Sequence, residues 1–327
     1  MDLSVVFLGT GGSVPSARRA TACVLIRAGG SRILVDAGEG AQRQMINSTW
    51  LVQVDDIYIT HFHADHYLGL PGLLKTYDLM ERQAPLRIVG PAGLHGLFES
   101  LRRIFGKLRY EVELVELGPG ERIEHDGFEM SAFAVEHRMK ALGYAYVEPE
   151  RPGRFDVDAA RGLGVSDDRD FGRLQRGETV AVDGSEVRPD QVLGESRPGR
   201  KVVITGDTAP SEMTRIAAHT AQLLIHDGTF AIEESARAAD TGHSTARDAA
   251  QLAADAEVHM LAIVHISSRY NVSAVLKEAR DAFPNTFAPR DFDLIEIPFP
   301  ERGDPELIQE GAKQRPEQLA EPAPAGD

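Results

Sequence analysis

A short run of metal-ligand side chains constrains this chain more than any other feature of its sequence. The run is His61, Phe62, His63, Ala64, Asp65 and His66, and it directly follows residues 56–60, which are typical of a short buried strand. Alternate residues at a strand end point to the same side, so His61 and His63 can bind one metal ion. Asp65 and His66, beyond the bend, can then face a second ion. The alternative, polar residues that only cap a helix, accounts poorly for this pattern.

The composition limits both the size of the fold and the ligands available to a metal. The 327 residues are 42% hydrophobic and 26% charged, an ordinary globular balance that can bury a large core. The length fits two domains or one large layered domain with an insertion. Cys23 is the single cysteine, which excludes a disulfide framework and a cysteine-based zinc site. Any metal here must be bound by histidines and carboxylates.

The charge is strongly acidic, with a formal net charge of −15 and only 6 Lys against 29 Arg. This balance fits a high-salt cytoplasm, or merely a GC-rich genome, and it argues against a generic polyanion binder. The apolar stretches are too short to span a membrane, and the first residues lack the basic start of a signal peptide. We therefore expect a cytoplasmic protein with no membrane contact.

The order of apolar segments predicts an α/β layered domain. We expect strands at 5–8, 22–27, 32–35, 56–60, 86–89, 112–117, 130–135, 201–205, 223–226, 260–264 and 294–297, and helices at 40–48, 68–82, 92–105, 245–254 and 272–282. Residues 150–197 interrupt this order of strands and helices, because they contain many glycine, serine, proline and acidic residues. They are predicted to be an inserted arm with a small helix at 156–162 and a hairpin at 179–187. Residues 301–327, with four prolines, are predicted to be a disordered acidic tail.

Three further candidate ligands, His137, Asp207 and His265, each follow a predicted strand. Alone, each is weak, because a residue after a strand is more often part of a turn. Together with the run at 61–66 they suffice for two sites. His61, His63 and His137 would bind one metal ion, Asp65, His66 and His265 the other, and Asp207 would bridge them. Imidazoles with few carboxylates favour zinc over magnesium.

Six segments of the sequence resemble one known family, ribonuclease Z, the tRNA 3′-processing endonucleases of the metallo-β-lactamase superfamily. They are SVVFLGTGGSVPS at 4–16, DAGEGAQRQ at 36–44, THFHADHYLGLPGLL at 60–74, GDT at 206–208, GHSTA at 242–246 and VHISSRY at 264–270. The histidine run indicates only the superfamily. The DAGEGAQRQ, GHSTA and HISSRY segments restrict the resemblance to the ribonuclease Z family. The resemblance extends from residue 3 to about residue 300.

This resemblance implies a four-layered αβ/βα sandwich, residues 1–300, with a dinuclear zinc site, two Zn²⁺ per subunit, at one edge, where Mn²⁺ can substitute in vitro. It implies a homodimer whose arm grips precursor tRNA, and no DNA substrate. Asp36 would orient the metal-binding loop, Asp65 would accept a proton as well as bind metal, and His243 would lie near the scissile phosphate. Cleavage would leave a 3′-hydroxyl on the tRNA and a 5′-phosphate on the trailer.

The arm departs from the family pattern, because residues 164–174 carry acidic side chains where a Gly-Pro-rich segment is usual. Arg169, Arg173 and Arg176 could still form one basic face. Near the predicted metal edge, Arg18, Arg19 and Arg43 are candidates for phosphate contacts or for ordinary solvated side chains. Two other functions stay open. One is a small-molecule phosphodiesterase or hydrolase on the same fold, and the other is a metal-free RNA-binding protein.

Overall fold

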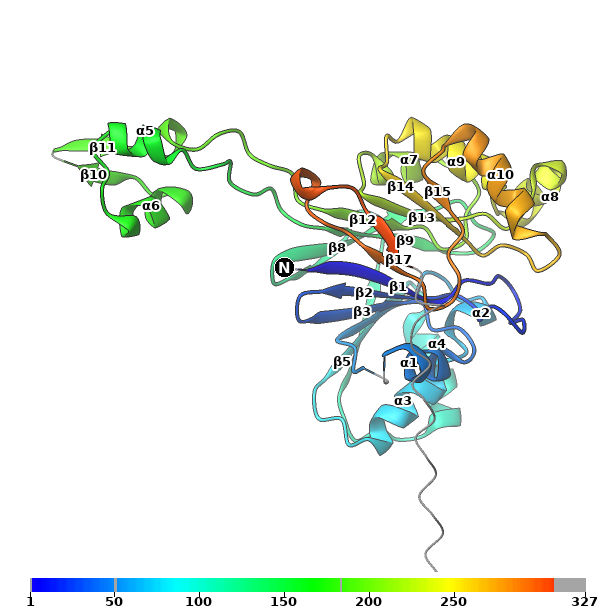
Figure 1. The fold of residues 1–327 in the computed structure, drawn as a ribbon. Coiled ribbons are helices and arrows are strands. Elements are labelled where there is room, and N and C mark those ends of the chain that lie inside the picture. The colour runs from blue at the N-terminus through cyan, green and yellow to red at the C-terminus, as the bar shows by residue number, and fades with distance from the viewer. Residues whose placement is uncertain (1, 50–51, 183, 309–327) are drawn as a thin grey trace, which may run out of the picture.

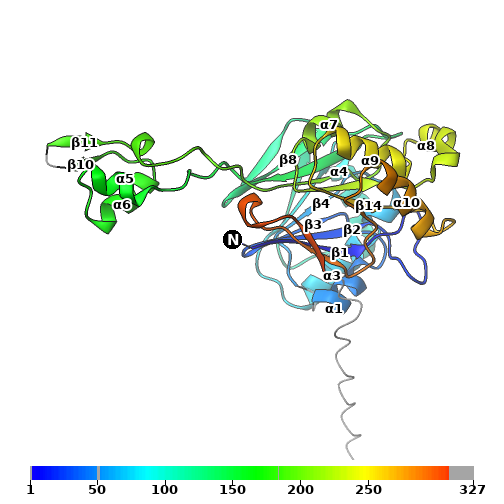
Figure 2. The same ribbon diagram turned by 45° about the horizontal axis from the view of Figure 1, so that its top comes forward.

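Two β-sheets packed face to face form the body of the protein, and helices cover the outer face of each sheet (Figure 1). The computed structural model describes residues 2–49, 52–182 and 184–308. A small lobe stands far out from this body on a thin two-stranded neck, as both ribbon views show (Figure 2). The predicted αβ/βα sandwich with an inserted arm is therefore confirmed.

The first sheet combines antiparallel strands at one side with parallel strands at the other. Its order within the described residues is β17-β16-β1-β2-β3-β4-β5-β6, and the pairs from β3 to β6 are parallel. The strands are β1 (Leu3–Gly9), β2 (Cys23–Ala28), β3 (Ser31–Val35), β4 (Asp56–Tyr58), β5 (Leu86–Pro91), β6 (Val112–Leu117), β16 (Leu294–Glu296) and β17 (Glu306–Ile308).

The second sheet repeats this plan with the order β15-β14-β13-β12-β9-β8-β7, in which β12 to β15 are parallel. Its strands are β7 (Arg122–His125), β8 (Phe128–Ala134), β9 (Leu142–Val147), β12 (Lys201–Ile204), β13 (Leu223–Asp227), β14 (Met260–Val264) and β15 (Thr286–Phe287). Because parallel strands point the same way, the carboxyl ends of β12, β13 and β14 meet at one edge of the sheet.

Helices α1 (Ala41–Thr49), α2 (Ala64–Tyr67), α3 (Leu70–Leu79) and α4 (Leu94–Phe105) belong to the first half of the body, and α7 (Glu212–Ala218), α8 (Ser235–Thr241), α9 (Ala246–Asp255) and α10 (Val272–Ala282) to the second. Short 3₁₀ turns η2 (Ile232–Glu234) and η3 (Pro300–Arg302) complete it. Thr245 caps α9 through a reciprocal bond pair with Asp248, and Pro71 lies in the first turn of α3, where it breaks no helical hydrogen bond.

Alternation along β1 shows how the layers are built. Val5 and Phe7 are buried between the two sheets, whereas Val6 and Leu8 are buried against α1, α3 and α4. A third cluster packs Val203, Leu224 and Leu261 under α9 and α10. Because both faces of the central strands are covered, their sequences are continuous apolar runs rather than alternating ones.

The arm is a small unit with a core of its own. It contains α5 (Val157–Gly162), α6 (Asp168–Gln175), the hairpin of β10 (Val180–Val182) and β11 (Ser185–Val187), and the turn η1 (Pro189–Gln191). Six buried apolar side chains fill its interior: Ala160, Val165, Leu174, Val180, Val187 and Val192. The predicted small helix and hairpin are both present, and the structure adds α6, whose start is capped by Asp167.

Some helices and strands are not predicted from the sequence, and the predicted domain ends before the last ordered strand. The unpredicted elements are α2, α6, α7, α8, β7, β9, β15 and β17. In β9, Gly143 hides the strand pattern, since a Cβ there would lie 2.2 Å from the Phe133 ring, and only glycine fits under that side chain. The disordered tail predicted from residue 301 is wrong over its first part, because η3 and β17 are ordered and β17 pairs with β16. Residues 309–327 of that tail lie outside the described residues.

We expect the arm to lose its structure independently of the body when its core is weakened. Leu174 is fully buried in the arm, so Leu174→Ala should cost about 2 to 4 kcal/mol of local stability. Hydrogen exchange should then accelerate in residues 157–191 and stay unchanged in α9. Leu163→Ala, in the same arm at 41% exposure, is the matched control. Faster exchange in α9 as well would show that arm and body unfold together.

Candidate metal centre

The candidate ligands lie where strands of both sheets end at one edge of the sandwich. Asp36 directly follows β3, and the histidine run follows β4 in the same sheet. In the facing sheet, Asp207 follows β12 and His265 follows β14. His137 lies three residues beyond β8. All seven ligands predicted from the sequence are brought together, in two groups.

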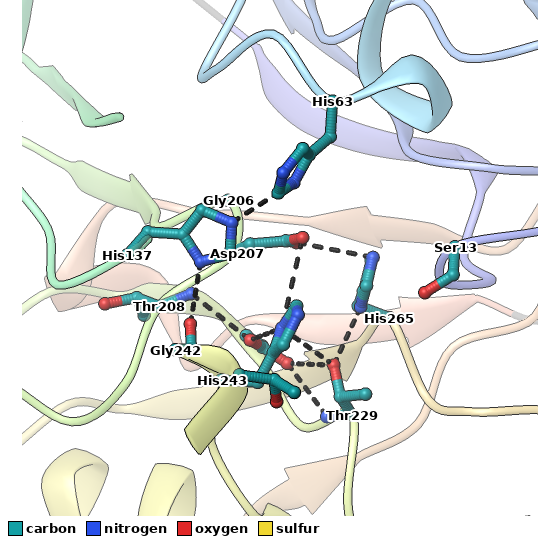
Figure 3. Close-up of polar contacts among 12 residues, drawn as sticks. Ser13, His63, His137, Gly206, Asp207, Thr208, Thr229, Gly242, His243 and His265 are labelled. Atoms are coloured by element: carbon teal, nitrogen blue, oxygen red, sulfur yellow. Dashed lines mark hydrogen bonds and ion pairs between the residues drawn. The ribbon is translucent and has the colours of Figure 1, made fainter. Parts of the chain in front are cut away.

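The first group consists of His61, His63, His137 and Asp207. The Nδ1 atom of His63 lies 3.0 Å from His61 Nε2 and 3.2 Å from His137 Nε2. His61 Nε2 lies 3.7 Å from Asp207 Oδ2. His63 reaches the group from the histidine loop and His137 from the opposite sheet, as Figure 3 shows. Three ring nitrogens thus converge on one point beside a carboxylate oxygen.

The second group consists of Asp65, His66 and His265, with the other oxygen of Asp207 beside them. Asp207 Oδ1 lies 3.4 Å from the Nε2 atoms of both His66 and His265. Asp65 Oδ2 lies 3.2 Å from His265 Nε2 and 3.6 Å from His66 Nε2. Asp207 therefore presents one oxygen to each group, as the predicted bridging role requires.

Both groups fit a divalent metal ion. A tetrahedral ion with bonds of about 2.0 to 2.1 Å holds its ligand atoms about 3.3 Å apart, close to the spacings observed in both groups. In addition, the buried Nε2 atom of His66 has no hydrogen-bond partner among the described residues. A buried polar atom without a partner is costly, and a cation would supply the missing one. Five imidazoles with two carboxylates suit zinc better than magnesium.

Hydrogen bonds behind the ligands orient the rings toward the two groups. Each bond uses the Nδ1 atom and leaves Nε2 pointing inward, which is how proteins fix the tautomer of a metal-binding histidine. The pairs are His66 Nδ1 with Asp36 Oδ2 at 2.7 Å, His137 Nδ1 with the Gly242 carbonyl at 2.7 Å, His265 Nδ1 with Thr229 Oγ1 at 2.7 Å and His61 Nδ1 with Thr60 Oγ1 at 3.1 Å. Asp36 also accepts hydrogen bonds from the Thr60 amide and hydroxyl. The predicted orienting role of Asp36 agrees with these contacts.

The buried carboxylates favour positive charge at the site. Burial alone would lower the pKa of His66, but the carboxylates of Asp207 and Asp36 raise it well above its ordinary value. Burial opposes ionisation of Asp207, yet His265 and His66 hold the pKa of that carboxyl well below its usual range. Carboxylates that stabilise a proton on a ring also stabilise a metal ion there. Metal binding must therefore compete with protons and weaken at acidic pH.

Two backbone features position the loops that carry the ligands. Asp36 and His265 have φ values of +59° and +62°, a strained region for residues with a side chain. Glycines accommodate the loops around them. Gly206 has a φ of +62°, and a Cβ there would lie 2.8 Å from Thr60. At Gly12, a Cβ would lie 2.5 Å from the Nδ1 atom of His265. The glycines that punctuate the sequence here are required by close approach.

His243 lies at the rim of the cluster and is held by a residue that the sequence analysis missed. Its Nδ1 atom lies 2.8 Å from Asp227 Oδ2. The Oδ2 atom of Asp207 is 3.9 Å away, on the side of the ring that faces the cluster (Figure 3). Burial would lower the pKa of His243, but the hydrogen bond to Asp227 raises it above its ordinary value. Asp227 ends β13 as Asp207 follows β12, so the same strand-end pattern was available to find it.

The arginines singled out in the sequence differ in their surroundings. In the arm, Arg173 and Arg176 both form ion pairs with Glu178, and Arg173 also contacts Asp170. The side chain of Arg169 has no hydrogen bond or ion pair with a described residue. Near the metal edge, the Arg19 guanidinium is a structural group, because it donates to Thr10 Oγ1 at 2.6 Å and to the Pro289 carbonyl at 2.9 Å.

Comparison with known proteins identifies the superfamily to which this fold and this candidate metal centre belong. Residues 17–265 match the metallo-beta-lactamase superfamily, to which this chain belongs. Among solved structures, the short form of human tRNase Z is 26% identical and superposes with a TM-score of 0.64, covering 90% of this chain and 99% of that one. YhfI from Bacillus subtilis, 17% identical with a TM-score of 0.67, shows the same fold.

Full-length relatives narrow the assignment. Ribonuclease Z of Natronomonas pharaonis is 45% identical over 307 residues, which is 92% of this chain and 100% of the relative. Ribonuclease Z of Methanosarcina acetivorans is 43% identical, covering 91% of this chain and 99% of its own length. The chain therefore belongs to the ribonuclease Z family.

The carboxylate behind His66 provides a direct test of the metal centre. Asp36→Asn keeps the shape of the side chain but removes the charge that orients His66, so metal affinity should fall about 10- to 100-fold. Titration against a chromogenic chelator measures this affinity, and metal analysis gives the number of ions bound. Asp126→Asn, the same change in an exposed turn, is the control. Equal affinity in both variants would contradict the role given to Asp36.

Proposed function

We propose that this chain is a zinc-dependent endoribonuclease that removes the 3′ trailer from precursor tRNA, leaving a 3′-hydroxyl on the tRNA and a 5′-phosphate on the trailer. One combined observation carries the proposal. The chain matches ribonuclease Z of Natronomonas pharaonis over 92% of its length, and it has all seven candidate ligands in two convergent groups. A relative that had lost catalysis while keeping the fold would have no reason to retain this geometry.

The residues at the site divide the chemical work. His61, His63 and His137 would hold one ion, Asp65, His66 and His265 the other, and Asp207 would bridge. Divalent ions held there would acidify water and stabilise the charge that develops on the phosphate. Asp65 would accept a proton as well as bind metal; its carboxylate is partly exposed, and the Ser13 amide donates to its Oδ2 atom at 2.8 Å and holds it in position.

His243 is suited to give a proton to the departing ribose oxygen. The Asp227 carboxylate binds its Nδ1 atom and stabilises the protonated ring, so the Nε2 proton is available to substrate. Thr229 supports the same arrangement, because its hydroxyl donates to Asp227 Oδ1 at 2.6 Å. This acid would serve the leaving group.

A groove that shares Arg18 with a hollow next to His265 would provide a path for the phosphate backbone. It encloses about 1350 Å³, and its lining includes Arg18, Arg43 and Arg290. None of these three guanidinium groups has a hydrogen bond or ion pair with a described residue, although many arginines elsewhere in this acidic protein pair with carboxylates. A smaller hollow shares Arg18 with the groove and is lined by Gly12, next to His265. Unpaired arginines grouped in this way are typical of a phosphate-binding surface.

Three further expectations belong to the proposal. Zinc is favoured by the donor set, with Mn²⁺ as a substitute in vitro. A homodimer is supported by exposed apolar side chains at or beside α1 and α3, which are Ile46, Leu68, Leu79 and Met80. None of the described helices is both long and apolar enough to cross a membrane. The cytoplasmic location stays a prediction.

Cleavage of precursor tRNA tests the proposed activity directly. With zinc or manganese present, the wild type should make a single cut at the base of the 3′ trailer. Asp65→Ala should lose this activity, because the variant lacks both a ligand and a proton acceptor. Asp126→Ala, in an exposed turn, should cleave normally. Hydrolysis of bis-p-nitrophenyl phosphate without any cleavage of precursor tRNA would instead support the small-molecule phosphodiesterase.

The role of His243 can be separated from that of the ligands. His243→Gln should lower kcat by roughly 10²- to 10⁴-fold, the usual contribution of general acid catalysis, and should leave the bound metal unchanged. Metal analysis and single-turnover cleavage of precursor tRNA provide the two measurements. Because Asp207, His243 and His265 also lie close enough to share an ion, loss of metal in this variant would identify His243 as a ligand instead.

A further inference from the structure

The neck that joins the arm to the body is thin. Its two strands pair through Arg151 and Arg197, whose amides donate to each other's carbonyls at 2.8 Å, and again where the Gly194 amide donates to the Arg154 carbonyl. At Gly153, a Cβ would lie 2.0 Å from the Gly194 carbonyl, so the strands are as close as backbones allow. A two-stranded ribbon has little stability or stiffness of its own. Contacts at its root must therefore determine where the arm points.

The contacts at the root come from the C-terminal segment, residues 297–302. Glu301, in η3, lies at the centre of a charge cluster. Its Oε2 atom accepts a hydrogen bond from the Arg151 guanidinium at 2.8 Å, and its Oε1 atom accepts bonds from Arg151 at 2.8 Å and from Arg197 at 3.0 Å. One carboxylate thus binds both strands of the neck. Its side chain is 24% exposed.

Stacking and a buried ion pair reinforce this contact. The centroid of the Phe299 ring lies 3.8 Å from the Arg151 guanidinium carbon and 4.1 Å from that of Arg200. Arg200 is buried, pairs with Glu148 where the neck leaves the body, and donates to the Ile297 carbonyl at 2.9 Å. Hydrogen bonds from Arg151 lower the pKa of Glu301 to about 2, so the carboxylate stays charged at neutral pH.

We propose that residues 297–302 form a clasp, centred on Glu301, that fixes the direction of the arm and thereby positions the arm on the RNA substrate. Glu301 is a positioning residue, remote from the reacting atoms. The inference rests on the proposed function only in its second half. The first half, that the clasp orients the arm, holds or fails without any RNA.

A distance measurement on the free protein tests the first half. Spin labels at Glu186→Cys in the arm and Lys277→Cys on α10 report the arm-to-body distance, and both positions are exposed. Cys23 is buried and will not take the label. Glu301→Ala should broaden the distance distribution. Glu306→Ala, which removes a carboxylate from β17 with no described ion-pair partner, should leave the distribution as in the wild type.

Kinetics on two substrates test the second half. For precursor tRNA, Glu301→Ala should raise KM roughly three- to tenfold, because a less constrained arm must be ordered on binding, with kcat within twofold of wild type. Hydrolysis of bis-p-nitrophenyl phosphate, which is too small to reach the arm, should not change. Glu301→Asp keeps the charge and should recover part of the loss in KM.

The outcomes separate the two proposals. A distance distribution unchanged by Glu301→Ala overturns the clasp, whether or not the protein cleaves RNA. A broadened distribution with an unchanged KM for precursor tRNA overturns the link between arm direction and substrate binding. If the wild type cleaves no precursor tRNA, the proposed function fails, and the distance measurement still decides whether the clasp exists.

Discussion

The carboxylate of Asp207 is the group on which the rest of the site depends. It is buried, and its two oxygens lie within 4 Å of the ring nitrogens of His61, His66, His265 and His243. A buried carboxylate surrounded by imidazoles is stable only if cations balance the charge and fill the space between the ligand atoms. The ligands come from both sheets of the sandwich, so a bound ion would also connect the two halves of the fold at this edge.

This arrangement explains why so much of the surrounding structure is specialised. Asp36 and His265 adopt strained backbone conformations, and Gly12 and Gly206 leave room for neighbouring side chains. Such costs are typical of loops that must hold ligands within a few tenths of an ångström, and the packed strands behind them supply the stability. The rigid body thus holds the chemistry, while the arm, on its thin neck, is free to serve substrate binding.

More of the candidate site than of the surrounding fold could be predicted from the sequence. His61, His63, Asp65 and His66 are neighbours in the chain, so local spacing alone reveals them. His137, Asp207 and His265 could be found because each follows an apolar strand. Asp227 has the same position and was overlooked, and its role follows from its partner His243, which lies 16 residues away in sequence. In β9, a glycine required by the Phe133 ring hid a strand, since the requirement comes from a neighbouring strand.

The chain alone reveals the candidate ligands, most of the strands and helices, an inserted arm and, through six matching segments, the family. These depend on local chemistry and periodicity. Packing of the folded chain sets which oxygen of Asp207 faces which histidines, and it brings Glu301 back to the neck of the arm. Pairings of this kind join residues as far as 150 positions apart, and nothing local in the chain encodes them. They follow from the way the two sheets pack and from the path of the C-terminal segment across the root of the arm.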